Sequence, residues 1–384
     1  MRILLASAFY TPFIQGGAEI STQILAEGLA ARGHRVDVVT AGKEDGTEQI
    51  GGVNVIRRVF PDAKISMGAL GGAGVRITRS DKLREIYREF FCTPAYLRIY
   101  RQILAAGEYD IAHASGNLYC MGRASFWRAC ESRQVPVSQA LRDPKLIHLD
   151  FAGGRADGIL ARITRRDFRR LHSVAAPSRY MLDHYREHGV SHPNSRVIPN
   201  AVDIGFVEDI GFDNKKNQVL YVGRMAEEKG IRTLLRAVAE TGERFELLLV
   251  GDGPLLRELS LPEHVRSIGF RDRQAVYRLM RESKAVVLPS EWPEAFGRTI
   301  IESIANGTVA LGSDSGAIPE ILPESCIFET KNAGALAARL DAVLGYDKHT
   351  YEERVRELQK ICEKYKKEQY IDQWETFFAE QAGA

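Results

Sequence analysis

The chain has 384 residues, 45% of them hydrophobic and 27% charged, a length typical of two or three domains and a composition that excludes disordered and collagen-like proteins. The net charge of +2 is the sum of +9 over residues 1–200 and −7 over the remainder, so the two halves differ electrostatically. The five cysteines include no Cys-x-x-Cys pair, which argues against a disulfide framework or a zinc site and favours a reducing, cytoplasmic compartment.

Short apolar runs alternate with helical patterns from the first residues onward. The run at residues 3–6 predicts a buried strand rather than a signal peptide, and a helix at 18–32 and a β-branched strand at 36–40 follow it. No run approaches the ~18 apolar residues that cross a bilayer. We expect further strands, separated by helices, at residues 53–59, 111–114, 135–139 and 174–176, and, where the pattern restarts, at 219–222, 247–250, 266–269, 285–288 and 309–312.

This alternation is typical of doubly wound α/β domains, and its restart predicts two of them. The polar, turn-rich segment 198–217 has no clear period and marks the boundary, so we expect an N-terminal domain of residues 1–200 and a C-terminal domain of residues 201–368. The tail contains a charged helix at 350–370 and an apolar stripe around Trp374, which needs a surface to pack against.

Two turns between a strand and a helix have the composition of phosphate-binding sites. Gly16 and Gly17 follow the first strand, where glycine lets backbone N–H groups approach a phosphate, although a plain tight turn is an equal alternative. Arg224 and Lys229 lie five residues apart after the strand at 219–222, a pattern that suits a diphosphate. Considered alone, these two side chains would be interpreted as solvated surface cations.

Glu294 and Glu302 form a third candidate feature. If a helix begins near Gly297, Glu302 lies in its second turn and Glu294 lies over its N-terminus. Both carboxylates would then face one crevice and accept hydrogen bonds from sugar hydroxyls. Two glutamates at this spacing are usually solvated. The combination of the glutamate pair with the cationic turn of Arg224 and Lys229 is more specific than either feature alone.

These motifs together resemble the retaining glycosyltransferases of family four, which have the GT-B fold of two Rossmann-like domains facing each other across a cleft. The segments 198–203, 250–254 and 316–320 resemble the same family. The resemblance covers nearly the whole chain; it is strongest over residues 198–322 and weaker over 45–135, where such enzymes recognise varied acceptors. It implies an N-terminal acceptor domain and a C-terminal donor domain, with the helix at about 369–384 crossing back onto the former.

The resemblance also implies roles for single residues. Arg224 and Lys229 would bind the diphosphate of the donor, Glu294 would contact its sugar, and Glu302 would hold its ribose. The backbone at Phe270 and Arg271 would read the base, which leaves uridine, guanosine and adenosine donors open. The implied donor site consists of Gly16, Gly17, Arg224, Lys229, Phe270, Arg271, Glu294, Phe296, Gly297 and Glu302.

The sequence departs from the family at one position near the reacting centre. Many members carry a histidine after the strand at 135–139, whereas this chain has Arg142 and Asp143. Arginine does not act as a base at neutral pH, but it stabilises phosphate or orients an acceptor. We count Arg142 with Arg224, Lys229 and Glu294 as catalytic, and Asp143 and His113 as possible acceptor-side residues; for His113, a purely structural role is the stronger alternative.

We expect no metal and no cofactor besides the donor substrate, because the histidines and carboxylates lack metal-ligand spacing and Arg224 and Lys229 supply positive charge. Five arginines share one face of a predicted helix, which favours an anionic acceptor or a membrane surface, with a solvated face as the plainer alternative. Nucleic acid is a poor partner for a chain of small net charge. The five arginines are Arg162, Arg165, Arg166, Arg169 and Arg170.

The sequence thus predicts a cytoplasmic, metal-independent, retaining glycosyltransferase that moves a sugar from a nucleotide-diphosphate donor. Its acceptor would be a glycan, a lipid-linked saccharide or a small molecule, in polysaccharide or glycoconjugate biosynthesis. A peripheral location at the inner face of the membrane stays open beside a purely cytoplasmic one. Two alternatives remain open: a nucleotide-sugar epimerase of GT-B fold and a non-catalytic nucleotide-sugar binder.

Overall fold

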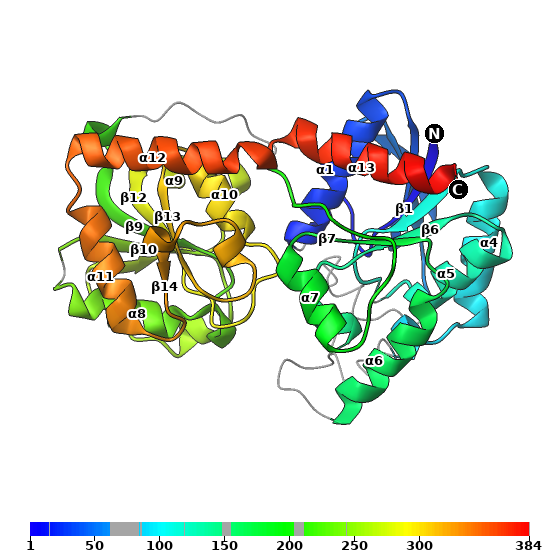
Figure 1. The fold of residues 1–384 in the computed structure, drawn as a ribbon, viewed down its shortest axis with the longest axis horizontal. Helices are drawn as coiled ribbons and strands as arrows, with labels where there is room; N and C mark the ends of the chain where they lie inside the picture. The colour runs from blue at the N-terminus through cyan, green and yellow to red at the C-terminus, as the bar shows by residue number, and fades with distance from the viewer. Residues whose placement is uncertain are drawn as a thin grey trace. The chain divides into compact units, whose positions relative to one another are not determined.

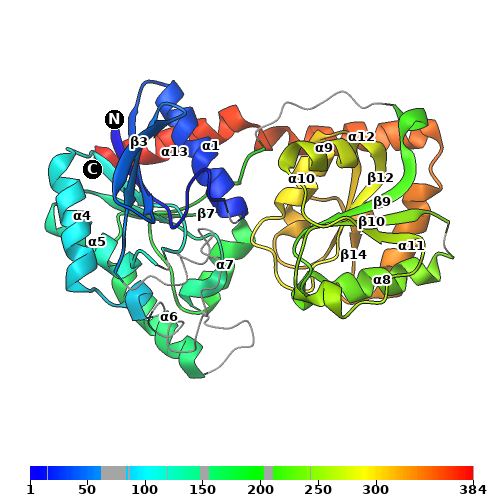
Figure 2. The same ribbon diagram turned by 180° about the vertical axis from the view of Figure 1, so that it is seen from behind.

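The computed structural model describes residues 1–14, 16–61, 84, 87–118, 120–147, 155–202, 211–242 and 244–383. The chain forms two compact units (Figures 1 and 2). Unit 1 contains Met1–Ala201 and Glu368–Ala384, and unit 2 contains Val202–Lys367. Each unit is an α/β structure in which helices flank a largely parallel sheet, the architecture that the alternating pattern predicts.

Unit 1 contains an eight-stranded sheet in the order β3-β4-β2-β1-β5-β6-β7-β8, and all neighbours are parallel except β3 and β4. The strands are β1 (Arg2–Ala6), β2 (Arg35–Ala41), β3 (Gly46–Ile50), β4 (Val53–Arg58), β5 (Ile111–Ala114), β6 (Val137–Ala140), β7 (Ser173–Ala176) and β8 (Ser195–Val197). Its helices are α1 (Gly17–Ala31), α4 (Pro94–Ala106), α5 (Arg123–Ser132), α6 (Arg155–Phe168), α7 (Arg179–Glu187) and α13 (Lys367–Ala382), with a 3-10 turn at Pro144–Leu146.

Helix α13, the last of the chain, belongs to the core of unit 1. It runs beside α1 (Figure 1), and its residues Trp374 and Phe378 are buried with Leu25 and Leu29 of α1. The two helices approach closely because Gly28 has no side chain: a Cβ there would lie 1.9 Å from Cδ1 of Ile371. The apolar stripe of the tail therefore packs on a surface of the first βαβ unit.

Unit 2 contains a six-stranded parallel sheet in the order β11-β10-β9-β12-β13-β14. The strands are β9 (Lys216–Val222), β10 (Glu246–Val250), β11 (Val265–Ser267), β12 (Ser283–Leu288), β13 (Val309–Ser313) and β14 (Ile327–Phe328). The helices are α8 (Ile231–Glu240), α9 (Arg273–Glu282), α10 (Arg298–Ala305), α11 (Ala333–Leu344) and α12 (Lys348–Cys362). Short 3-10 turns lie at Phe212–Asn214, Glu227–Lys229, Pro254–Arg257, Ile318–Glu320, Glu324–Cys326 and Glu363–Tyr365.

The strand order of each sheet defines where a ligand is most easily held. In unit 1 the order runs outward in opposite directions from β1 and β5, and in unit 2 it does so from β9 and β12. At such a switch point the loops that follow the two strands diverge and leave a crevice at their carboxyl ends. The candidate residues after β1, β9 and β12 are therefore at the edges where doubly wound sheets bind ligands.

The structure corrects several sequence-based expectations. No helix separates the predicted strands 36–40 and 53–59; the segment between them forms β3, which pairs antiparallel with β4 across the turn at Gly51 and Gly52. The strand predicted at 135–139 is displaced to Val137–Ala140, and the short strands β8 and β14 were not predicted. The predicted helix 350–370 ends at Cys362, and the chain turns before α13 begins.

Part of the predicted boundary segment 198–217, namely residues 203–210, lies outside the described residues. Within the described part of the chain, no helix combines the length and the apolar character that spanning a bilayer requires.

Candidate functional site

The cationic turn of unit 2 connects β9 to α8. Its 3-10 segment Glu227–Lys229 ends at Gly230, which adopts the left-handed conformation with φ +70° and caps the N-terminus of α8. A Cβ on Gly230 would lie 1.8 Å from the carbonyl oxygen of Pro289. Glycine is therefore required both by the backbone conformation and by the close approach of the loop that follows β12.

The loop of residues 289–294 lies directly on this turn. The carbonyl oxygen of Glu228 accepts hydrogen bonds from the backbone N–H groups of Glu291 and Trp292, at 3.0 and 3.1 Å. On its other side, Glu294 forms a parallel bridge with Gly316, and the N–H of Ala317 donates to the Glu294 carbonyl at 2.8 Å. Three sequence motifs that are far apart in the chain thus form one hydrogen-bonded unit at the switch point.

Lys229 and Glu294 meet within this cluster. The Lys229 ammonium lies 2.6 Å from Oε1 of Glu294, and the Ser290 hydroxyl donates to the same oxygen at 2.7 Å. Both charged side chains are largely buried, at 24% and 17% exposed. An ammonium has three donors, so Lys229 keeps hydrogen-bonding capacity for an anion while Glu294 holds it in place.

Arg224 is more exposed than Lys229. Its side chain is 64% accessible and forms an ion pair with Glu228, four residues further along the chain. An exposed ion pair of this kind contributes little stability. Arg224 can therefore readily exchange Glu228 for a phosphate, which offers bidentate geometry.

Glu302 lies in the second turn of α10, as the sequence predicts, and Gly297 caps that helix in the left-handed conformation. The Glu302 carboxylate pairs with Arg298 at 3.1 Å, whereas Glu294 pairs with Lys229, so the structure gives the two carboxylates different partners. The Phe296 ring is 5% exposed and packs edge-on against Tyr365. That ring belongs to the core, which leaves the Phe296 backbone as the part of this residue that a donor could contact.

Phe270 and Arg271 follow β11. The backbone N–H of Phe270 donates to Oδ2 of Asp252 at 3.1 Å, and its carbonyl accepts from the Arg271 guanidinium at 2.8 Å. The backbone groups of Phe270 that were expected to read a base therefore already have partners in this structure. The Phe270 ring itself is 73% exposed and offers a stacking face.

In unit 1, Gly16 and Gly17 stand at the N-terminus of α1. Gly16 caps the helix in an extended conformation, and its N–H donates to Oε2 of Glu19 at 2.8 Å. Burial raises the pKa of Glu19 above its ordinary value, against the opposing effects of its backbone hydrogen bonds and of the Arg142 charge. A phosphate approaching Gly16 would have to displace this carboxylate.

Arg142 follows β6 and is held by three neutral oxygens. Its guanidinium donates to the carbonyl of Ser115 at 2.6 Å, to Oδ1 of Asn200 at 2.7 Å and to the hydroxyl of Tyr370 at 3.4 Å. Ser21 of α1 also donates to Asn200, at 3.0 Å. Because these partners carry no charge, they orient Arg142 and leave its positive charge available to an anion.

Asp143 and His113 differ in their access to solvent. Asp143 is half-buried, and its Oδ1 accepts from the Asn117 side chain at 2.7 Å and from the backbone of Lys145 at 2.9 Å. His113 is fully buried, hydrogen-bonded to Ser138 at 2.8 Å and packed against Trp374, and burial, aided by the Arg142 charge, lowers its pKa well below the ordinary value. The geometry favours the structural role for His113 and does not support an acceptor-side role.

Sequence reasoning did not find the residues that position Arg142. Asn200 and Tyr370 lie 58 and 228 positions away from it, and only the folded chain brings them together. Glu19 lies two residues after the glycine pair, and its spacing of three from Gly16 was the one available signal for its hydrogen bond to the Gly16 N–H. Among the described residues, no group of three or more His, Cys, Asp or Glu side chains is arranged to hold a metal ion.

Two family models match the chain. One, described as glycosyl transferases group 1, matches residues 206–369, and the other, described as a glycosyl transferase 4-like domain, matches residues 16–201. An uncharacterized glycosyltransferase of Methanocaldococcus jannaschii is 26% identical over 90% of this chain and 89% of that protein. The phosphatidyl-myo-inositol mannosyltransferase of Mycobacterium tuberculosis is 25% identical over 88% of this chain and 86% of that protein.

Solved structures share the fold over nearly the full length. Sucrose-phosphate synthase from Thermosynechococcus elongatus has a TM-score of 0.76 at 21% identity, covering 99% of this chain and 98% of that one. Anabaena HepE in complex with UDP has a TM-score of 0.74 at 18% identity, covering 99% and 100%.

Proposed function

Since this chain belongs to the group 1 glycosyltransferases and has their GT-B fold, we propose that it moves a sugar from a nucleotide-diphosphate donor to a glycan, lipid-linked or small-molecule acceptor. The observation that carries the proposal is the cluster of Arg224, Lys229 and Glu294 at the switch point of the unit 2 sheet. It combines cations for a diphosphate with a fixed carboxylate for a sugar hydroxyl.

In this proposal Arg224 and Lys229 neutralise the charge that develops on the departing diphosphate. Glu294, which Lys229 and Ser290 hold in one orientation, accepts a hydrogen bond from the donor sugar, and Glu302 accepts one from the ribose. Positive charge aimed at the leaving group stabilises the transition state more than the ground state, because the charge on the bridging oxygen grows as the bond breaks. The same two cations make a metal ion unnecessary in the proposed mechanism.

We further propose transfer with retention of configuration by a front-face route. The bond between the sugar anomeric carbon and the phosphate oxygen breaks, and the acceptor oxygen bonds to the same face of that carbon. The departing phosphate oxygen takes the acceptor proton. No side chain needs to act as a base, which agrees with Arg142 at the position where other members carry histidine.

Polysaccharide or glycoconjugate biosynthesis is the context that these relatives favour. One of them is named as a phosphatidyl-myo-inositol mannosyltransferase and another, from Bacillus anthracis, as an N-acetyl-alpha-D-glucosaminyl L-malate synthase, so the acceptors of similar proteins differ widely. In unit 1 the arginines of the predicted face are exposed on α6 and the turn after it, except Arg170, which is partly buried. We propose that this face allows peripheral association with an anionic membrane.

A thermal-shift screen with UDP, GDP, ADP and dTDP tests the proposal. A nucleoside diphosphate at ~100 times its dissociation constant should stabilise the binding unit by about 2.7 kcal/mol, and the matching nucleotide sugar should then be turned over with retained anomeric configuration in the NMR spectrum of the product. The proposal fails if no nucleoside diphosphate raises the melting temperature. The Anabaena complexes with UDP and UDP-glucose make uridine diphosphate the first candidate.

A further inference from the structure

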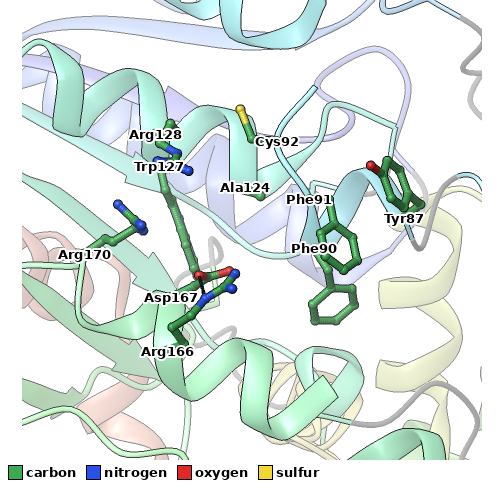
Figure 3. A pocket seen from close by; sticks show the side chains of 10 residues that line it. All are labelled: Tyr87, Phe90, Phe91, Cys92, Ala124, Trp127, Arg128, Arg166, Asp167 and Arg170. Atoms are coloured by element: carbon green, nitrogen blue, oxygen red, sulfur yellow. Dashed lines mark hydrogen bonds and ion pairs between the residues drawn. The ribbon is translucent and has the colours of Figure 1, made fainter. Parts of the chain in front are cut away.

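Unit 1 contains a pocket that none of the proposed donor residues lines. It lies between α5, the segment α6 to Arg170, and a helical turn at residues 87–90, and its volume is about 390 Å³, within the range of small-molecule sites (Figure 3). Its lining combines aromatic rings with arginines. The lining residues are Tyr87, Phe90, Phe91, Cys92, Ala124, Trp127, Arg128, Arg166, Asp167 and Arg170.

The aromatic side of the pocket is unusually accessible. Tyr87 and Phe91 stack with their ring centres 4.8 Å apart, yet they are 55% and 40% exposed. Phe90 and Trp127 continue the aromatic wall as buried side chains, at 3% and 1% exposed. A stacked, solvent-facing aromatic pair above a buried aromatic floor is an apolar surface without a covering element among the described residues.

The charged side of the pocket carries an excess of positive charge. Arg128 has no ion-pair or hydrogen-bond partner within the described part of the chain, and Arg170 forms an ion pair with Glu131. Arg166 lies 2.9 Å from Asp167, the one carboxylate in the lining, and remains 64% exposed. Asp167 and Glu131 offset two of the three arginines, so one net positive charge, that of Arg128, remains to favour an anionic ligand, and arginine suits phosphate in particular.

A buried ion pair lies behind the aromatic floor, where Nε of Arg123 lies 3.4 Å from Oε1 of Glu89. The guanidinium of Arg123 is fully buried, 4.5 Å from the Trp127 ring centre and 4.9 Å from that of Phe90, and both of its Nη atoms lack hydrogen-bond partners in the described structure. The indole N–H of Trp127 is also buried without an acceptor. Arg123 does not line the pocket and Glu89 offsets its charge, so it supports the aromatic floor and adds no net charge to the pocket.

We propose that this pocket binds an anionic amphiphile, a phosphorylated group attached to an apolar chain. The arginines contact the phosphate and the Tyr87–Phe91 pair contacts the chain. Neither half of the lining suits a simpler ligand: a free sugar phosphate leaves the exposed aromatic pair uncovered, and a neutral lipid leaves Arg128 without an anion.

The pocket is connected with the candidate acceptor side through one loop. Glu89, which precedes Phe90, accepts hydrogen bonds from the backbone N–H groups of Leu118 and Arg123, at 3.4 and 3.5 Å. Asn117 of the same loop donates to Asp143 at 2.7 Å. If the proposed glycosyl transfer is correct, on which this step rests, the amphiphile is the acceptor class, a lipid-linked phosphate.

Calorimetric titration of the full chain with octyl phosphate, octyl glucoside and inorganic phosphate tests the pocket. Octyl phosphate should bind at least about tenfold more tightly than either of the others, since only it offers both the charge and the chain. Arg128→Ala and Arg166→Ala should each weaken the binding of octyl phosphate by about fivefold or more.

Arg162→Ala is the matched control, because Arg162 is exposed on the same helix but does not line the pocket. Its affinity for octyl phosphate should stay within about twofold of wild type, as expected for a charge that makes no direct hydrogen bond. Two results would overturn the proposal and favour binding to a diffuse basic surface. One is an equal loss of affinity in Arg162→Ala and Arg166→Ala, and the other is an equal affinity for octyl phosphate and inorganic phosphate.

Binding of the nucleoside diphosphate, measured on the same samples, separates this inference from the proposed function. Both pocket variants should keep wild-type nucleotide affinity, since their side chains lie in unit 1 and Arg224 and Lys229 lie in unit 2. If the nucleotide binds and octyl phosphate does not, the pocket inference is wrong and the proposed donor chemistry stands. If octyl phosphate binds and the nucleotide does not, the amphiphile site stands and its assignment as acceptor site is wrong.

Discussion

At the scale of single residues, two glycines of unit 2 hold the candidate donor site together. Gly230 and Gly316 both have positive φ, and a Cβ on either would collide with the backbone of the loop 289–294. The sequence predicted a cationic turn at Arg224 and Lys229, but it contained no sign that Pro289 lies against the glycine that follows. The close contact depends on the pairing of β9 with β12, which brings together segments about sixty positions apart.

Gly230→Ala should therefore be far more harmful than Gly242→Ala. Both glycines have nearly the same positive φ, at 70° and 74°, but a Cβ on Gly242 would meet nothing within 4 Å. We expect chemical denaturation to show a loss of about 1 kcal/mol for Gly242→Ala, from backbone strain alone, and of about 3 kcal/mol for Gly230→Ala, which adds a steric clash. Equal losses for the two variants would show that the loop contact is unimportant.

His113 makes the stability of unit 1 depend on pH. Its folded-state pKa lies well below the ordinary value, so the folded protein keeps the ring neutral while the unfolded chain takes up a proton below about pH 6.5. The stabilising contribution of the neutral ring is therefore present above that pH and is lost as the pH falls further.

The unfolding free energy should accordingly drop by about 1.4 kcal/mol between pH 7.5 and pH 5.5 from His113 alone. His113→Gln should remove this share of the drop in urea unfolding curves. His349→Gln, at a side chain that is 80% exposed, is the control for the substitution itself and should change the stability at pH 7.5 by less than about 0.5 kcal/mol. A pH dependence unchanged by His113→Gln would contradict the burial of a neutral ring.

At the scale of elements, α13 is the clearest case of a sequence pattern that requires a partner. The stripe around Trp374 predicted packing, and the structure supplies α1, β5 and the ring of His113 as the surface. The break between α12 and α13 could not be predicted, because the segment 363–366 is as charged as the helix before it and has no proline or glycine. The break follows from tertiary structure: the backbone of Tyr365 pairs with Val202.

Trp374→Ala should destabilise unit 1 by about 3 to 5 kcal/mol, because it deletes a large side chain that is 2% exposed in the core. Glu380→Ala on the same helix removes only an exposed ion pair with Arg196 and should cost less than about 1 kcal/mol. Thermal unfolding of both variants provides the comparison. A small loss for Trp374→Ala would mean that α13 is not part of the core of unit 1.

The hairpin β3–β4 shows why one element was missed. The strand β3 is almost wholly exposed and lacks an apolar run, so hydrophobic pattern alone does not reveal it. It forms because its backbone pairs with β4 across Gly51 and Gly52, both with positive φ. Buried central strands, by contrast, were predicted to within three residues at each end, because burial on both faces makes them continuously apolar.

At the scale of the whole molecule, the two units differ in how many segments of the chain form them. Unit 2 is continuous in sequence, whereas unit 1 needs both Met1–Ala201 and the C-terminal segment that begins at Glu368. The fold class could be predicted because the alternation of strands and helices is local. The partners of Arg142 could not, because Asn200 and Tyr370 come from the two separate segments of unit 1.

A fragment of residues 202–367 should therefore fold alone and bind the nucleoside diphosphate, since it contains Arg224, Lys229 and both candidate glutamates. Residues 1–201 alone should not fold stably, because the buried side chains of α13 are missing from their core. Circular dichroism melting curves of the two fragments test this. A cooperative transition for 1–201 would contradict the assignment of α13 to unit 1.

The most direct test of the account is the affinity of unit 2 for the diphosphate. Calorimetry should show that Arg224→Ala and Lys229→Ala each weaken binding of the nucleoside diphosphate about 10- to 100-fold, because each removes a charge-assisted hydrogen bond of roughly 1.5 to 3 kcal/mol. Arg266→Ala, at an exposed arginine of unit 2 that pairs with Glu246, should bind the nucleotide as wild type does. Unchanged affinity in both Arg224→Ala and Lys229→Ala would contradict the assignment of this cluster as the donor site.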